Sequence, residues 1–414
     1  MSDVLDRFLK YCAVPSQSNP LTAANVPSTP AQFDMAQVLE QELLELGADN
    51  VVVNDTCYVC ASWPASQGCE DLPCLGLCAH LDTAWQANGS PVHPRVVHYE
   101  GGNLVMGEVD GVSVFTTPED NPALDHMVGW DIVCTDGTSL LGGDDKAGVA
   151  AIMSLLKRLK DDPTIAHPRL AIAFVPDEEI GHGASLLDLD AWGATWGYTV
   201  DGGPLGEFCY ECFNAAEITL HAKGFSVHTG TAKGLMINAA ESLMKVNALL
   251  PAQDRPEFTQ DYEGFYYLER MEGGCEEATT AYIIRDHNAA QFAHRKQLIV
   301  DAIAYVNAQY GSEVITYEMH DQYLNMAEVV KDHKHLVENA RRAYAAQGID
   351  MKIIPMRGGT DGAQLSYRGL PCPNLSACYY NAHGVKEFVP VPELEAMVDV
   401  LESLVGLYST EQGL

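Results

Sequence analysis

Basic residues are scarce in this chain. Only 24 lysines and arginines stand against 57 aspartates and glutamates, so the 414 residues carry a formal net charge of −33 at pH 7. A surface this acidic repels phosphate backbones and anionic lipid, which argues against nucleic acid and membrane as partners. No apolar run approaches the roughly 20 residues of a membrane-spanning helix. The opening MSDVLDRFLKYC also lacks the basic end and apolar core of a signal peptide, so we expect a cytoplasmic protein.

Cysteine is present, but its spacing does not indicate a metal ribbon or a disulfide framework. Two of the twelve cysteine positions begin Cys-x-x-Cys pairs, Cys57/Cys60 and Cys209/Cys212, which lie far apart in the sequence. A zinc ribbon would bring its two pairs within about 20 residues of each other. A chain of this length also builds a core without disulfides. We therefore expect these cysteines to pack in strands as small apolar residues.

The periodicity of apolar residues predicts an α/β protein with an inserted unit. Helices are expected at 2–13, 31–47, 146–160, 334–347 and 392–408, and buried strands at 51–62, 72–79, 169–175 and 197–200. Segment 215–320 instead alternates three strands (216–222, 279–286, 315–321) with helices at 234–250 and 289–309. A short apolar run at 351–355 and a Gly-rich loop at 357–362 follow. We predict a catalytic domain with a mixed sheet between helices in two parts, 1–212 and 324–414, and an inserted α+β lid domain at 213–323.

Acidic residues and histidine follow apolar runs in four separate segments. They are His80 and Asp82 in LGLCAHLDT, Asp144 and Asp145 in GGDDKAG, Glu178 and Glu179 in VPDEEIG, and Asp201 in YTVDGG. Each has an ordinary alternative, because acids at helix starts accept orphan N–H groups or complement the helix dipole. In open α/β sheets, however, ligands bind beyond the carboxyl ends of strands. We therefore expect the four segments to converge on one crevice.

A group of converging carboxylates requires a cation, because like charges repel and are costly to desolvate. Two zinc ions bring +4, which three carboxylates and a bridging hydroxide balance. We assign the carboxylates to Asp144, Glu179 and Asp201. Neutral His80 and His383, the latter in NAHGVKEF, complete the set. These ligands suit zinc, with manganese or cobalt as alternatives.

Three acids in the same segments are left without a ligand role, and we assign other roles to two of them, Glu178 and Asp82. Glu178 is adjacent to a ligand but is not needed for charge balance, so we predict that it is the general base. It would take a proton from a water whose pKa the metal has lowered. Asp82 lies two residues after His80 and would accept its second imidazole N–H, which fixes the tautomer.

The motifs, taken in order along the chain, resemble those of a known enzyme family. HLDT, GGDDKAG, PDEEIG, VDGG, VHTGTAKG, YIIRD, RGGTDGAQLSYRGLPCPN and NAHGVKEF are similar to the motifs of the peptidase T group. These tripeptide aminopeptidases belong to the di-zinc metallopeptidase family that also contains the aminoacylases and carboxypeptidase G. The resemblance covers essentially the whole chain. It implies a di-zinc aminopeptidase-like catalytic domain with an inserted lid.

The resemblance also implies how the ligands are shared. His80 and Asp201 would bind one zinc, Glu179 and His383 the other, and Asp144 would bridge the two. A cis peptide bond is expected at Asp144–Asp145.

Three further motif positions suggest substrate binding. His228 in VHTGTAKG resembles a lid histidine that polarises the scissile carbonyl, and its alternative is a surface loop histidine. Arg357 in RGGTDG would bind a substrate carboxylate through its planar fork. Arg285 in YIIRD would do the same, or pair with its neighbour Asp286. Asp361 is equally well explained as a turn residue that caps its loop.

These residues together predict an aminopeptidase that releases the N-terminal residue from short peptides, tripeptides preferred, by attack of a zinc-bound hydroxide. Its partners would be short peptides with a free N-terminus, and the lid domain would either form a homodimer or act alone. A dipeptidase or an N-acyl amino acid deacylase would use the same di-zinc residues. A metal-binding scaffold protein would be expected to lack Glu178 or a ligand, and none is missing.

Overall fold

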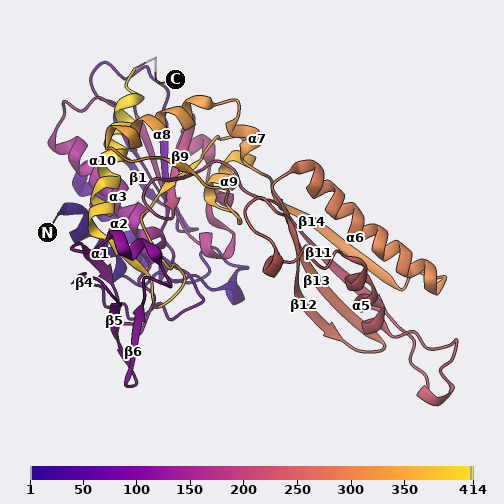
Figure 1. Ribbon diagram of the computed structural model, residues 1–414. Coiled ribbons are helices and arrows are strands. Elements are labelled where there is room, and N and C mark those ends of the chain that lie inside the picture. The colour runs from indigo at the N-terminus through magenta and orange to yellow at the C-terminus, as the bar shows by residue number, and fades with distance from the viewer. Residues whose placement is uncertain (1, 411–412, 414) are drawn as a thin grey trace. The chain divides into compact units, whose positions relative to one another are not determined.

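A computed structural model describes residues 2–410 and 413 of the chain (Figure 1). The chain divides into two compact units. The first unit contains the residues up to Tyr210, Glu328–Ile354 and the residues from Thr360 onward. The second contains Glu211–Ala327 and Pro355–Gly359. In the described part of the chain, no helix is long and apolar enough to cross a membrane.

A mixed eight-stranded sheet forms the centre of the first unit. Its middle strands β8, β3, β9 and β16 run parallel to one another, whereas β1, β2 and β10 pair antiparallel with neighbours. Strands β8 and β3 are buried along their whole length, which explains why they read as continuous apolar runs. Across the sheet the order is β1 (Asp49–Val53), β2 (Val59–Trp63), β8 (Leu170–Val175), β3 (Leu75–His80), β9 (Trp196–Gly202), β16 (Asn374–Ser376), β10 (Glu207–Cys209) and β15 (Lys352–Ile353).

Helices α1, α2 and α10 of this unit pack against α3 (Gly143–Asp161), which also contacts the strands β3 and β9 (Figure 1). The start of α3 lies very close to the sheet. A Cβ atom on Gly148 would lie 1.9 Å from the carbonyl oxygen of Val200 in β9, so only glycine allows this approach. The other α-helices are α1 (Asp3–Cys12), α2 (Gln32–Leu46), α4 (Leu189–Trp192), α7 (Ala327–Val330), α8 (Lys334–Ala346), α9 (Asp361–Tyr367) and α10 (Val391–Leu407), and the first residue of α7 belongs to the second unit.

Two smaller β structures accompany the main sheet in the first unit. One is a three-stranded sheet of β17 (Phe388–Pro390), β7 (Asp131–Cys134) and β4 (Arg95–His98). The other is the hairpin of β5 (Leu104–Val109) and β6 (Val112–Thr116). Both were absent from the sequence prediction. Because β17 pairs antiparallel with β7, the C-terminal part of the chain is fastened beside the segment that leads into α3.

The second unit is an antiparallel four-stranded sheet with helices packed against it (Figure 1). The strand order is β12 (Phe265–Gly273), β13 (Glu277–Asp286), β11 (Asn214–Lys223) and β14 (Ile315–Tyr323). Helices α5 (Ala239–Leu249) and α6 (Ala289–Tyr310) contact the sheet, and their apolar residues form one core with β11 and β13. The sequence predicts both helices and three of these strands, but it does not predict β12.

Three local predictions are wrong in their boundaries. The run 51–62 is not one strand but the strands β1 and β2, because the Asn54 side chain accepts the N–H groups of Thr56 and Tyr58 and closes a turn. The helix expected from 234 begins at Ala239, where Asn238 caps the N–H of Glu241. The Gly-rich loop expected at 357–362 ends earlier, because Thr360 caps α9.

The division into units also differs in detail from the expected domains. The second unit runs from Glu211 to Ala327, close to the expected 213–323, but it also takes Pro355–Gly359 from the segment expected to be catalytic. Arg357 explains this assignment. Its guanidinium donates to the carbonyl oxygens of Asp261 (2.8 Å) and Glu263 (2.9 Å), which lie in the second unit.

Candidate metal centre

The predicted ligands come from neighbouring strand ends and loops of the first unit. His80 is the last residue of β3, and Asp201 lies in the adjacent strand β9. Glu178 and Glu179 begin the short helix η3 (Glu178–Ile180), which follows β8 on the other side of β3. Asp144 lies at the start of α3. Because these elements adjoin, residues far apart in the sequence meet at one edge of the sheet.

Asp144 lies at the centre of the cluster. Its Oδ1 is 2.9 Å from Nε2 of His80, and its Oδ2 is 3.2 Å from Nε2 of His383. The same His383 nitrogen lies 3.1 Å from Oε2 of Glu179. Asp144 therefore has one carboxylate oxygen toward each histidine, the arrangement that a bridging ligand requires.

A second group of ligand atoms surrounds His80. Its Nε2 is 3.6 Å from Oδ1 of Asp201. Ligand atoms of His80, Asp144 and Glu179 all lie within 4.8 Å of one another, and so do those of His80, Asp145 and Asp201. The structure thus brings together all five predicted ligands and adds Asp145 to them.

Asp82 is positioned to orient both His80 and the two glutamates. His80 Nδ1 lies 3.0 Å from the backbone carbonyl oxygen of Asp82 and 3.4 Å from its carboxylate Oδ1. The Asp82 carboxylate also accepts the backbone N–H groups of Glu178 (3.0 Å) and Glu179 (3.3 Å). One buried side chain thereby connects the β3 end to the segment that follows β8. The sequence predicts the first of these contacts but not the second.

The carboxylates of the cluster are buried, and burial disturbs their protonation. Burial and the charge of Asp201 raise the pKa of Glu178, and burial and the charge of Asp144 raise that of Glu179. Burial acts against the charged form of Asp144 as well, but hydrogen bonds from His383 and His80 hold its pKa well below the usual range. Protein groups alone therefore leave part of this cluster protonated at neutral pH.

The donor set fits a pair of divalent cations. Glu179 Oε1 and Asp145 Oδ1 are buried oxygen atoms without a hydrogen-bond partner among the described residues. Such atoms are costly unless something satisfies them. Imidazole nitrogen and carboxylate oxygen together suit zinc, and a cation would replace the protons that the cluster otherwise needs. His80, Asp144, Glu179, Asp201 and His383 would hold it.

The peptide bond between Asp144 and Asp145 is cis, as the resemblance implied. Asp145 Oδ2 accepts the backbone N–H of His80 at 3.2 Å. This contact links the start of α3 to the end of β3.

Three acids of the site region escaped the sequence prediction as functional groups. Asp145 appeared to be a helix-capping acid, and Asp361 a turn residue. Asp361 is fully buried, its Oδ1 accepts the N–H of Ala184 (2.6 Å), and burial raises its pKa to about 7. Glu387 is buried beside Asp144 and accepts backbone N–H groups from that loop. An acid that accepts backbone N–H groups from a distant loop leaves no pattern in the sequence, because every residue except proline offers the same N–H donor.

The predicted substrate-binding residues all lie in the second unit. Arg357 donates to two carbonyl oxygens and to Thr259 Oγ1 (2.9 Å), and it stacks on Phe213 and Phe265. Arg285 donates to the carbonyl oxygen of Ala216 (3.2 Å). The alternative ion pair of Arg285 with Asp286 does not form, because Asp286 binds Arg295 instead (2.7 Å).

His228 is exposed and begins the short helix η5 (Thr229–Thr231). Its Nδ1 accepts the backbone N–H of Gly230 at 3.1 Å. In a neutral ring this contact places the proton on Nε2, so the other nitrogen is a donor.

Buried imidazole and carboxylate ligands at adjacent strand ends define a metal-dependent hydrolase site on an α/β fold. A family model, Peptidase family M20/M25/M40, matches residues 142–406. The chain belongs to this peptidase family. It is therefore a metallopeptidase.

Relatives of the chain match over its full length. Peptidase T of Parabacteroides distasonis is 44% identical over 404 residues, and peptidase T of Geobacillus kaustophilus is 42% identical over 407 residues. Each alignment covers 98% of both chains. Full-length matches at this identity relate both units, and not the metal-binding core alone, to peptidase T.

Solved structures show the same fold. The aminopeptidase PepT of Bacillus cereus superposes with a TM-score of 0.77 at 21% identity and covers 99% of this chain and 98% of its own. A Bacillus subtilis protein described as a dinuclear metal-binding peptidase of the M20 family has a TM-score of 0.67 at 14% identity, with 98% and 97% covered. The predicted fold class is confirmed.

Proposed function

We propose that this metallopeptidase is a zinc-dependent aminopeptidase that releases the N-terminal residue from short peptides, with tripeptides preferred. The observation that carries the proposal is the Asp144 carboxylate, which faces His80 on one side and His383 on the other. The full-length identity to peptidases T supports the same reading. The substrates are short peptides with a free N-terminus.

The chain's own residues account for the proton transfers. Bound zinc ions would polarise the scissile carbonyl and lower the pKa of water. Glu178 takes a proton from the attacking water and returns it to the leaving amine. The Asp82 carboxylate accepts the backbone N–H of Glu178 and so holds Glu178 in place. His228, which resembles the histidine that polarises the scissile carbonyl in related enzymes, would donate its Nε2–H to the developing oxyanion.

Length preference would come from recognition of the substrate carboxylate. Arginine matches a carboxylate through paired N–H donors, and Arg285 and Arg357 are the predicted partners. Arg357 already donates to three groups of the second unit, whereas contacts to two carbonyl oxygens are described for Arg285 NH1. The Arg285 guanidinium also lies over the Tyr323 ring, 5.5 Å from its centroid, so both arginines have partners in the second unit and both are proposed for the substrate carboxylate.

A panel of substrates tests the function. We expect release of free amino acid to be fastest from an unblocked tripeptide, slower from a tetrapeptide, and slower again from the tripeptide amide, which lacks the carboxylate. Equal rates for the tripeptide and its amide would contradict carboxylate recognition.

A dipeptide and an N-acetyl amino acid, added to this panel, separate the related activities. Cleavage confined to a dipeptide would indicate a dipeptidase, and cleavage confined to an N-acetyl amino acid would indicate a deacylase. Either result would overturn the aminopeptidase assignment while leaving the metal residues unchanged.

A further inference from the structure

Glu387 is a buried carboxylate that binds the loop in front of α3. It is only 1% exposed. Its Oε2 accepts the backbone N–H groups of Leu141 (3.0 Å) and Gly142 (2.7 Å), and its Oε1 accepts the N–H of Asp144 (2.9 Å). Both oxygens are used, and each of the three donors belongs to the loop that carries the central aspartate.

The same residue also belongs to the loop of His383. The backbone N–H of Glu387 donates to the carbonyl oxygen of Gly384 (3.2 Å), which closes the turn after His383. The next residue, Phe388, begins β17 and pairs with Cys134 of β7. Glu387 therefore stands where the His383 loop crosses the Asp144 loop, and it fixes the backbone of both.

The packing around the carboxylate leaves little room for rearrangement. A Cβ atom on Gly143 would lie 3.1 Å from Glu387 Oε1 and 2.8 Å from Val389 Cγ2. Gly142 has a φ of +74°, a conformation that side chains rarely adopt. Two glycines thus allow the backbone N–H groups to approach one side chain.

We propose that Glu387 is a positioning residue of the metal centre. It sets the place of the Asp144 carboxylate relative to His383, and so the spacing of the two ligand groups. The proposal rests on the metal-binding function proposed above. We do not place Glu387 among the metal ligands, because both of its carboxylate oxygens accept backbone N–H groups.

An amide cannot replace the carboxylate at this place. Glutamine has the same size, but its NH₂ group would face N–H donors on one side, and at least one buried donor would lose its partner. The Asp144 backbone would then shift. Outer residues that orient metal ligands typically change metal affinity or activity by about 10–100-fold when replaced.

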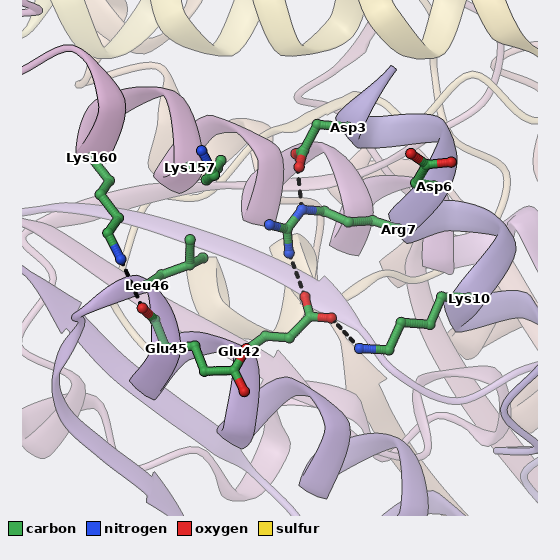
Figure 2. Close-up of a pocket in the computed structure, with 9 residues that line it drawn as sticks. All are labelled: Asp3, Asp6, Arg7, Lys10, Glu42, Glu45, Leu46, Lys157 and Lys160. Carbon is green, nitrogen blue, oxygen red and sulfur yellow. Dashed lines mark hydrogen bonds and ion pairs between the residues drawn. The ribbon is translucent and has the colours of Figure 1, made fainter. Parts of the chain in front are cut away.

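Glu387→Gln provides the test, and Glu42→Gln provides the matched control. Glu42 is also largely buried, and it also accepts three donors, which are Arg7 and Lys10 (Figure 2) and the hydroxyl of Tyr11. It lines a pocket with Lys157, near the far end of α3 and about 16 Å along the helix axis from Lys146. Both substitutions therefore remove one negative charge and disturb three contacts, but only one of them touches the metal loops.

Three readouts distinguish positioning from general destabilisation. In Glu387→Gln, we expect zinc affinity, measured by competition with a chromophoric chelator, to fall about 10–100-fold. The visible absorption bands of the Co²⁺-loaded protein should change in intensity. At saturating zinc, kcat should fall while KM stays unchanged. Glu42→Gln should keep wild-type values in all three measurements.

The opposite results overturn the proposal. Wild-type zinc affinity and an unchanged cobalt spectrum in Glu387→Gln would do so, as would an equal loss of zinc affinity in Glu42→Gln. If Glu387→Gln does not fold, Glu387→Asp, whose shorter carboxylate cannot span all three donors, is judged by the same criteria. If the wild-type protein bound no zinc, the proposed function itself would fall.

Discussion

Glu178 and Glu179 are adjacent in sequence but have different surroundings. Oε2 of Glu179 lies 3.1 Å from Nε2 of His383, and the Glu179 side chain is 4% exposed, as expected for a metal ligand. The backbone N–H of Glu178 is bound to Asp82, and no contact between its carboxylate and either histidine is seen among the described residues. Burial and nearby carboxylates raise the pKa of Glu178, and the positive charge of bound metal ions would oppose this shift and keep the carboxylate able to accept a proton from water.

Glu178→Gln tests this role. The substitution keeps the size of the side chain but removes its ability to accept a proton. We expect kcat to fall by about 10²–10⁴-fold while zinc content stays at the wild-type level. Steady-state kinetics and metal analysis of the same preparation check both. Unchanged kcat would contradict the base assignment, and loss of zinc would identify Glu178 as a ligand instead.

His228 is the second residue whose proposed role can be isolated. Its Nδ1 is occupied by the Gly230 N–H, so Nε2 is available as a donor in the neutral ring. His228→Ala should lower kcat by about 10²–10³-fold, the usual loss when an oxyanion donor is removed. Wild-type kcat in this variant would make His228 an ordinary loop residue that caps η5.

Some site residues could be predicted from the sequence and others could not. His80, Asp144, Glu178, Glu179 and Asp201 follow apolar runs, and the parallel strands β3, β8 and β9 bring them together. Asp145 follows the same run as Asp144, but nothing in the sequence assigns it a role, and Glu387 follows no such run. The contacts of Asp145 with the His80 N–H, and of Glu387 with the Asp144 N–H, depend on loop conformation.

At the scale of secondary-structure elements, an ion-pair network joins α1 to α2. Glu42 of α2 accepts hydrogen bonds from Arg7 and Lys10 of α1 (Figure 2), and it also accepts one from the hydroxyl of Tyr11 at 2.5 Å. The Glu42 side chain is 13% exposed, and the Tyr11 residue is buried. Removal of the charge would leave Arg7, whose side chain is 13% exposed, and the buried Tyr11 hydroxyl poorly paired.

Glu42→Gln should therefore lower the free energy of unfolding by about 1–3 kcal/mol. Denaturant titration measures the change, and peptidase kcat should remain that of the wild type. Asp6→Asn is the control, because Asp6 lines the same pocket but is exposed, and its effect should stay within about 0.5 kcal/mol. Equal effects of the two substitutions would contradict the network.

Long elements were predictable, whereas short ones were not. Helix α6 and strands β8, β11 and β13 agree with the sequence because an apolar face repeats along them. Strands β16 and β17 have only three residues each, too few for a period to show. They are held by pairing with β9 and β7, contacts that depend on the rest of the fold.

At the scale of the whole molecule, acid stability depends on buried histidine as well as on the carboxylates. His335 lies half-buried beside Trp196, with ring centroids 4.5 Å apart, and its Nδ1 is 3.1 Å from the Tyr408 hydroxyl. Burial and the charge of His333 lower the pKa of His335 to about 4. The unfolded chain, with a histidine pKa near 6.5, therefore binds more protons than the folded chain between about pH 6.5 and 4.

This histidine should make stability fall as the pH is lowered through that range. After allowance for its partial exposure, we expect a contribution of about 1–2 kcal/mol. His335→Gln should flatten the pH dependence of unfolding by this amount between pH 6.5 and 4, as measured by denaturant titration at several pH values. A slope identical to that of the wild type would contradict the shift.

The central claim is that two zinc ions held by the Asp144 cluster are required for peptide cleavage. The most direct measurement is zinc titration of the chelator-treated protein, with release of amino acid from a tripeptide followed at each step. We predict no activity without zinc and a maximum at two zinc ions per chain. Full activity in the zinc-free wild-type protein would contradict this requirement. So would wild-type activity in a His80→Ala variant that no longer binds zinc at this cluster.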